Sequence, residues 1–132
     1  MKRKNLKALL CAASLLAVTG CRSVPDPATI PTEMSVAELA QKGQSAFDSN
    51  NFKAAEVYYQ LIIDRYGTDV SALTAAEFEI AHLRMKKKDW DDARIRLEAL
   101  IDRYEIAGGA GLPPEYLVLA KNDLERITST NK

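Results

Sequence analysis

The sequence predicts an all-α fold of two similar helical hairpins followed by one closing helix. Residues 51–66 and 89–104 follow one pattern, and both segments end in the letters IDRY. The matching positions are three, four, three and one residues apart, which places them on one face of a helix and excludes one face of a strand. A repeat of 38 residues is typical of a solenoid of stacked helical units, each unable to bury its apolar side alone.

The paired positions of the repeat indicate how its helices pack. They are Phe52 with Trp90, Ala55 with Ala93, Tyr59 with Leu97 and Ile62 with Leu100. We expect the alanines to lie where two helices approach each other, so that leucine at either position destabilises the fold by about 1–3 kcal/mol. The aromatic pair is expected to fill the space between hairpins, and Trp90→Ala to cost about 3–5 kcal/mol. Within IDRY, the isoleucine and tyrosine extend the buried stripe, and the arginine lies near a helix C-terminus, where positive charge is favourable.

The first helix is predicted to begin at Ser35. The stretch S-V-A-E has the form of a capping box, in which Ser35 accepts a hydrogen bond from the Glu38 amide and Glu38 reaches back. The apolar stripe of this helix is Val36, Leu39, Gly43, Ala46 and Phe47. Because glycine within a helix costs about 1 kcal/mol relative to alanine, we expect another backbone to lie close to Gly43.

The next three helices have recognisable ends. The second is expected to be capped by Asn50 or Asn51 and to end at Tyr66, with Gly67 closing it in a left-handed turn. The third is expected over residues 71–87, with a core stripe of Leu73, Ala76, Ile80 and Leu83. The fourth is capped by Asp89 and ends before Gly108.

A last helix is predicted after the loop of residues 105–114. It begins at Pro113 or Pro114, because proline suits the first turn of a helix. Its apolar positions are Leu117, Ala120, Leu124 and Ile127. We interpret it as a closing cap, since the terminal element of a solenoid usually differs from its repeats. The helical domain is therefore expected over residues 35–129.

Residues 1–20 are predicted to be a bacterial lipoprotein signal peptide. Four basic residues precede an apolar run of twelve, which is shorter than the roughly 20 residues of a membrane-spanning helix. The following LAVTGC resembles the lipobox, in which the cysteine, here Cys21, receives a lipid and becomes the mature N-terminus. An ordinary signal peptide with an accidental cysteine is the alternative. The prolines of residues 21–34 indicate a flexible tether, able to hold a domain up to ~40 Å from the lipid.

Composition argues against several classes of function. The signal peptide contains four of the 18 basic residues and none of the 18 acidic ones, so the rest of the chain is mildly acidic. It therefore lacks the clustered positive charge with which proteins bind nucleic acid. With Cys11 in the signal peptide and Cys21 lipidated, no thiol remains for catalysis or metal binding. His82 is the single histidine and lacks partner ligands at helical spacing, and the GGAG of residues 108–111 lacks the context of a phosphate loop. We therefore expect no enzyme, no cofactor and no metal site.

The two hairpins resemble tetratricopeptide repeats. That family places a small residue midway in the first helix, an aromatic residue at the start of the second and an alanine three residues later. The matching residues are Gly43, Phe52, Ala55 and Tyr59 in the first unit and Ala81, Trp90, Ala93 and Leu97 in the second. Glu77 and Arg84 depart from the pattern, because the family usually has apolar residues there. The repeat length and the aliphatic-rich end of each second helix are similar to those of envelope lipoproteins related to BamD, the barrel-assembly component.

The resemblance implies a concave groove that binds peptide segments of partner proteins. Its expected lining is Gln44, Phe47 and Asp48 from the first hairpin and Phe78, His82, Met85 and Lys86 from the second. Phe78 and Met85 also form a second apolar stripe on the third helix. Either this helix is buried on two faces or the stripe meets a partner.

The leading hypothesis is a lipid-anchored adaptor on the periplasmic side of the cell envelope, with outer-membrane assembly or envelope maintenance as its setting. It would hold envelope proteins or their peptide segments, and would contact the membrane through its N-terminal lipid. The alternatives are a solute-binding accessory and a passive structural lipoprotein that self-associates. Arg22 follows the lipid cysteine where some bacteria use aspartate to retain a lipoprotein in the inner membrane, which favours the outer membrane.

Overall fold

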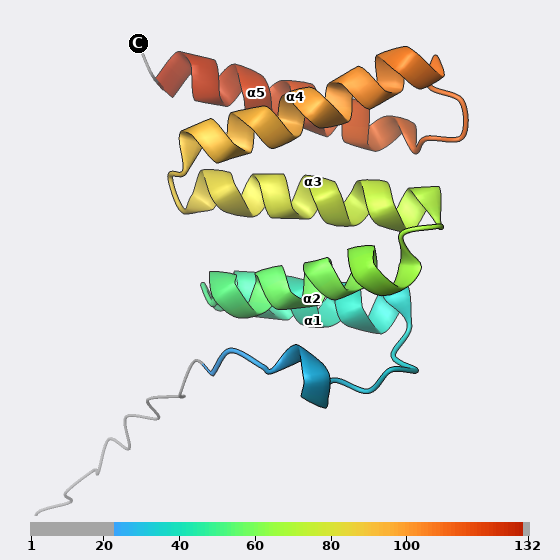
Figure 1. Ribbon diagram of the computed structural model, residues 1–132. Helices are drawn as coiled ribbons and strands as arrows, with labels where there is room; N and C mark the ends of the chain where they lie inside the picture. Colours follow the sequence, from blue (N-terminus) through green and yellow to red (C-terminus); the bar gives the residue numbers. More distant parts are fainter. Residues whose placement is uncertain (1–22, 131–132) are drawn as a thin grey trace, which may run out of the picture.

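The computed structural model describes residues 23–130, and its regular structure over that range is entirely helical (Figure 1). The elements are the 3-10 helix η1 (Pro27–Thr29) and five α-helices, α1 (Val36–Asp48), α2 (Phe52–Tyr66), α3 (Val70–Lys86), α4 (Trp90–Ala107) and α5 (Pro114–Thr130). The predicted all-α class is confirmed, and each predicted helix is present close to its expected place. The predicted signal peptide, Cys21 and Arg22 lie outside the described residues.

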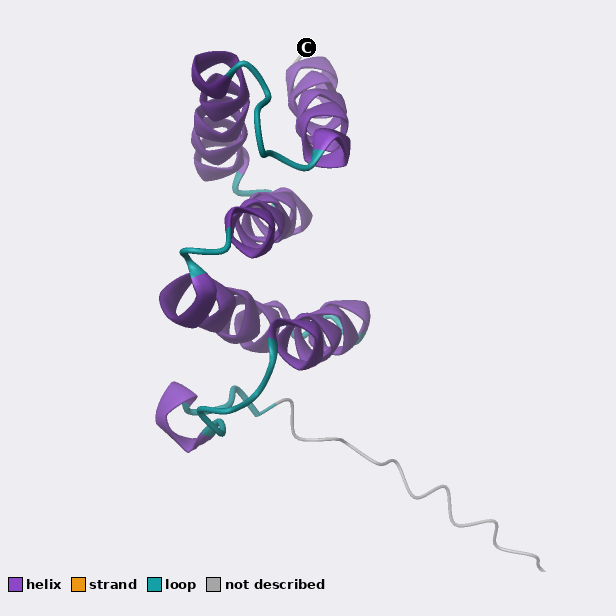
Figure 2. Cartoon of the chain, turned by 90° about the vertical axis from the view of Figure 1, so that its right-hand side faces the viewer, coloured by secondary structure: helices purple, strands orange, loops and turns teal. Residues whose placement is uncertain are grey.

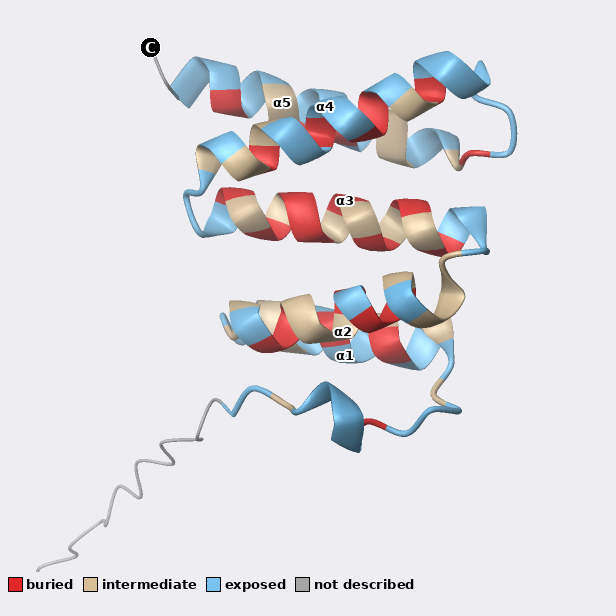
Figure 3. Ribbon diagram, in the orientation of Figure 1, coloured by how far each residue is buried: buried red, intermediate tan, exposed pale blue. Residues whose placement is uncertain are grey.

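The helices form a stack in which neighbours along the chain pack side by side. α1 packs on α2, α3 contacts both α2 and α4, and α5 contacts α4 and α3. Figure 2 looks along the helix axes and places α2 and α4 on one side of the stack and α1 and α5 on the other, with α3 between them. Because other helices cover α3 on two sides, buried and half-buried residues run along most of its length (Figure 3).

Local hydrogen bonds explain where the helices begin. The capping box at α1 is present, with the Ser35 amide donating to Glu38 Oε2 at 2.9 Å and the Glu38 amide donating to Ser35 Oγ. Asn51 caps α2 by accepting from the Ala54 amide. α3 begins at Val70 because the side chain of Asp69 accepts from two backbone amides of its first turn. Asp89 occupies the N-cap position of α4 as predicted, but its side chain makes no capping hydrogen bond.

Two glycines differ from their predicted roles. At Gly43 the close neighbour is a side chain, not a backbone, because an added Cβ would lie 2.7 Å from the ring of Tyr59. Gly67 ends α2 in a right-handed conformation with φ −62°, where an added Cβ would lie 2.6 Å from the carbonyl oxygen of Ile63. The left-handed closure predicted for α2 is therefore wrong. Gly108, with φ 58°, does close α4 in the left-handed conformation that favours glycine.

The four paired positions that precede IDRY are buried to a similar degree in both hairpins. Ala55 and Ala93 are each 0% exposed, and the Ile62 and Leu100 side chains are each 2% exposed. Phe52 and Trp90 are both half-buried, so the loss expected for Trp90→Ala falls below the range for a fully buried tryptophan. The repeat therefore marks equivalent positions along the two helices, although Ile63 and Tyr66 are half-buried where Ile101 and Tyr104 are buried.

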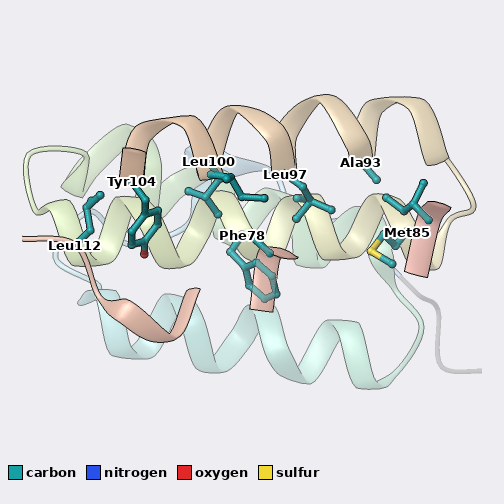
Figure 4. Packing of buried hydrophobic residues seen from close by; sticks show 11 residues of the cluster. Phe78, Met85, Ala93, Leu97, Leu100, Tyr104 and Leu112 are labelled. Carbon is teal, nitrogen blue, oxygen red and sulfur yellow. The ribbon is translucent and has the colours of Figure 1, made fainter. Parts of the chain in front are cut away.

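The core consists of two clusters that share α3. One cluster joins α1, α2 and one side of α3, and includes Leu39, Tyr59 and Ile80. The other joins the opposite side of α3 to α4 and α5, with Leu97 and Leu100 near its middle (Figure 4). Of the predicted α3 stripe, Ala76, Ile80 and Leu83 are buried, whereas Leu73 is half-buried beside a fully buried Thr74.

The repeated IDRY segment fixes the ends of α2 and α4 to neighbouring backbone. The hydroxyl of Tyr66 donates to the carbonyl oxygen of Met34 at 2.7 Å, just before α1. In the same way, the hydroxyl of Tyr104 donates to the carbonyl oxygen of Pro113 at 2.5 Å, just before α5. Each tyrosine thus ties the end of its own helix to the start of another. Asp64 accepts from Gln60 in the same helix, and Asp102 is exposed.

We expect Tyr104→Phe to lower the free energy of unfolding by about 0.5–1.5 kcal/mol, because it removes one hydrogen bond and leaves the ring in place. Urea unfolding followed by circular dichroism measures the change. Tyr58→Phe is the matched control, because the half-buried Tyr58 has no side-chain hydrogen bond among residues 23–130. Equal effects of the two substitutions would contradict the role given to the Tyr104 hydroxyl.

The segment before α1 differs from the flexible tether that its prolines suggested. From Ser23 onward it is folded back on α2, and Ile30 is 7% exposed within the first core cluster. Arg65, from the first IDRY, donates to the carbonyl oxygens of Pro31 at 2.7 Å and Ile30 at 3.0 Å. A carbonyl oxygen has two lone pairs, and that of Pro31 also accepts a hydrogen bond from the Met34 amide at 3.3 Å. Any tether that reaches a membrane would therefore have to lie before Ser23.

Candidate partner-binding groove

A groove runs along α3 between α1 and α5. Its first section, about 320 Å³, lies between α1, α3 and the start of α5, and its middle section, about 290 Å³, lies further along the same three helices. The last section, about 330 Å³, extends to Trp90 and to the end of α5. Gln44 and Glu79 line both the first and the middle sections, and His82 and Arg126 line both the middle and the last. The three sections therefore adjoin one another along α3.

Six of the seven residues predicted for a groove line it. Gln44, Phe47, Phe78 and His82 border the middle section, and Met85 and Lys86 border the last. Asp48 lies beside the groove without lining it, and its Oδ1 accepts a hydrogen bond from Gln44 Nε2 at 2.8 Å. The lining that the resemblance to tetratricopeptide repeats implied is thus largely present as a groove, whatever occupies it.

Phe78 and Met85 belong mainly to the core. Their exposed fractions are 6% and 9%, and both are part of the cluster formed with α4 and α5. Phe78 packs against Tyr116 of α5 with ring centroids 5.5 Å apart. Of the two explanations that the sequence left open, burial of α3 on two faces is the one observed. Replacing both residues by serine would therefore unfold the domain in part, and would not test binding alone.

His82 is held in the middle section by a partner that the sequence did not reveal. Its Nδ1 lies 2.6 Å from Oδ2 of Asp123, a carboxylate on α5 that is 4% exposed. The His82 ring also stacks near Phe47 and Phe78, with centroids 5.8 and 5.9 Å apart. A second contact joins Asp123 to Arg126 at 3.4 Å. This group of side chains links α3 to α5 across the groove.

Glu79 is the acidic residue of the groove that has no such partner. It is half-buried at the junction of the first and middle sections, and no hydrogen bond or ion pair joins it to another of residues 23–130. Burial raises the pKa of Glu79, and the nearby Asp123 carboxylate raises it further, while His82 acts in the opposite direction. Burial also raises the pKa of Tyr59 and of Tyr116, with the charge of Glu79 adding to both. Sequence reasoning missed Glu79, because a glutamate on a helix usually points to solvent.

We expect the free energy of unfolding to fall as the pH rises from 4.5, the ordinary pKa of a glutamate, through the raised pKa of Glu79. The sign follows because the folded chain holds this proton more tightly than the unfolded chain does. Glu79→Gln should remove that fall, so the variant gains stability relative to the wild type as the pH rises. Urea unfolding at a series of pH values measures the difference.

Glu98→Gln is the control for this pH series, because Glu98 is exposed on α4 and lines none of the three sections. If the stability difference between Glu79→Gln and the wild type stayed constant across the series, the burial assigned to the Glu79 carboxylate would be incorrect.

The two departures from the tetratricopeptide pattern form ion pairs away from the groove. Arg84 of α3 pairs with Glu56 of α2 and, at 2.9 Å, with Asp92 of α4. Glu77 pairs with Arg103 of the second IDRY at 2.5 Å, and this contact raises the pKa of Arg103. Glu77 and Arg84 can replace the apolar residues of the family pattern because each pairs with an opposite charge on an adjacent helix.

The described part of the chain has neither a cluster of metal-ligating side chains nor a helix suited to crossing a membrane. No three histidine, cysteine, aspartate or glutamate side chains within residues 23–130 gather closely enough to hold a metal ion. None of the helices in the same range combines the length and the apolar character needed to cross a membrane.

The chain is similar in sequence to a known bacterial protein. An uncharacterized protein of Treponema pallidum (strain Nichols) is 40% identical over 107 residues, which are 81% of this chain. The matched region is 43% of that relative, so the chain spans less than half of its length. No protein-family model matches the chain, and no solved structure matches it.

Proposed function

We propose that this chain is a protein-binding adaptor of the tetratricopeptide type, which holds a segment of a partner protein in the groove between α1, α3 and α5. The observation that carries the proposal is the succession of three adjoining groove sections along one helix. A small-molecule site is usually a single enclosed pocket, whereas a row of open sections suits an extended or helical segment.

The tetratricopeptide assignment is supported by the two hairpins themselves. Ala55 and Ala93 are equally buried at the contact between helices, and the equivalent aromatic residues are equally half-buried. The first helix of each hairpin, α1 or α3, supplies most of the groove lining together with α5. α2 and α4 lie on the other side of the stack (Figure 2) and contribute only Tyr59, Ile62 and Trp90 to that lining.

Photo-crosslinking in the native cells tests the adaptor proposal. A benzophenone amino acid at Gln44, exposed at the junction of two groove sections, should give discrete protein adducts that mass spectrometry can identify. The same group at Ala99, exposed on α4 and outside the groove, is the matched control. Equal adducts at both positions, or none at Gln44, would reject the groove as a partner site. Adducts only with a second copy of this chain would favour a self-associating structural protein.

The location proposed for the adaptor is the bacterial envelope, with a lipid on Cys21 and attachment to the outer membrane facing the periplasm. This part rests on the lipobox-like LAVTGC and on the basic and apolar residues before it. A role among BamD-like lipoproteins rests on the repeat pattern of residues 51–66 and 89–104.

Labelling with an alkyne fatty acid tests the anchor. Label should be incorporated into the wild type and lost in Cys21→Ser. Cys11→Ser is the matched control, because Cys11 and Cys21 are the two cysteines of the chain. Retention of the label in Cys21→Ser would reject the lipidation site.

A further inference from the structure

Resting on the proposed function, we infer that the groove takes a peptide segment carrying a lysine or arginine, whose cation binds the Glu79 carboxylate between Tyr59 and Tyr116. The charge of the groove supplies the first argument. Asp123 is paired with His82 and Arg126, and Asp48 accepts from Gln44. Among the carboxylates that line the groove, Glu79 therefore has no hydrogen-bond or ion-pair partner within the described residues.

A half-buried carboxylate without a partner has lost part of its hydration and gained no interaction in return. A cation from a bound segment would supply that interaction, so the energetic cost of leaving Glu79 unpaired in the free protein becomes binding energy in the complex. An acidic segment would meet uncompensated negative charge at the same place. The charge therefore selects a basic residue over an acidic one.

The surroundings of Glu79 supply the second argument. Tyr59 and Tyr116 line the first groove section together with Glu79. Aromatic rings attract ammonium and guanidinium groups through their negatively polarised faces, and their apolar edges pack on the aliphatic stem of such a side chain. A carboxylate next to two tyrosines is thus a combination that fits a lysine or arginine side chain.

The shape of the first section supplies the third argument. Its floor is made of small residues of α3, and α1 and α2 contribute further apolar side chains; the apolar lining is Val36, Ala40, Ile62, Ala72, Ala75 and Ala76. Residues flanking the cation in the bound segment are therefore expected to be apolar. Because the groove continues past Glu79 into two more sections, we commit to a peptide and not to a small free amine.

Selection of a random phage-displayed peptide library on the full chain tests the inference. Peptides bound to the wild type should share a lysine or arginine beside apolar residues. Selection on Glu79→Gln should lose that basic position, whereas selection on the control Glu98→Gln should keep it. Circular dichroism of each variant checks that the helices are retained.

A selected peptide then allows a direct test of pairing between its cation and Glu79. Its binding should weaken about tenfold when its lysine is acetylated, or its arginine is replaced by citrulline, and by a similar factor in Glu79→Gln. Combining the two changes should add little further loss, because both remove the same interaction. A full additional loss in the combined case would overturn the inference.

The remaining outcomes separate the inference from the function on which it rests. If the library gives acidic or wholly apolar peptides that block crosslinking at Gln44, the adaptor function stands and the basic specificity is wrong. If no peptide binds in the groove, both fail. If spermidine alone binds through Glu79 and displaces the selected peptides, the site is one for free amines and the peptide assignment is overturned.

Discussion

Leu97→Ala should lower the free energy of unfolding by about 2–5 kcal/mol, the range observed when a fully enclosed leucine is truncated. Leu97 is 0% exposed and lies in the cluster that joins α3, α4 and α5 (Figure 4). Its loss leaves a cavity that the surrounding helices can fill only in part. Because a domain of this size is typically stable by only about 5–15 kcal/mol, the loss is a large share of the total.

Urea unfolding measures the Leu97→Ala effect, with the slope of the transition expected to stay unchanged. Leu119→Ala is the matched control, since it deletes the same atoms from a leucine of α5 that is 42% exposed. We expect the control to cost a small fraction of the Leu97 value. A similar loss at both positions would mean that the enclosed packing around Leu97 is incorrect.

Ala93→Leu should destabilise the domain by about 1–3 kcal/mol through overpacking. Ala93 is 0% exposed at the first turns of α4, where that helix lies against α3. A leucine there must push the two helices apart or adopt an unfavourable rotamer. Ala55, the equivalent residue of α2, has the same exposure, so Ala55→Leu should give a loss of similar size.

Ala99→Leu controls for the change in helix propensity, because Ala99 is exposed on the same helix as Ala93. Alanine and leucine both favour helices, so this substitution should change stability little. Thermal and urea unfolding of the three variants test the prediction together. If Ala93→Leu were tolerated as well as Ala99→Leu, the close approach of α3 and α4 at this position would be refuted.

Much of the helical framework could be predicted because its signals are local. The capping box at Ser35 and Glu38, the cap at Asn51 and the closure at Gly108 each depend on a few neighbouring residues. The repeat also predicted which positions of α2 and α4 are equivalent. The prediction failed at Gly67, because glycine after a helix suggests left-handed closure and its observed role is to avoid a contact with the Ile63 carbonyl.

The groove could be predicted in outline but not in its chemistry. The resemblance to tetratricopeptide repeats placed Gln44, His82 and Lys86 along one surface, and all three line the groove. It could not reveal the contact of His82 with Asp123, since the two residues are 41 positions apart in the chain. Nor could it show that Glu79 is half-buried, because that depends on how closely α1 and α5 approach α3.

The sequence by itself therefore determined the helices, their ends and the equivalence of the two hairpins, because helix periodicity and capping act over a few residues. Only the tertiary structure decided which polar groups are enclosed and which apolar stripe is covered. α3 carries two apolar stripes, and its own residues cannot specify that α4 and α5 cover Phe78 and Met85. The same holds for the segment before α1, where Arg65 binds the carbonyl oxygens of Ile30 and Pro31 only because α2 lies beside them.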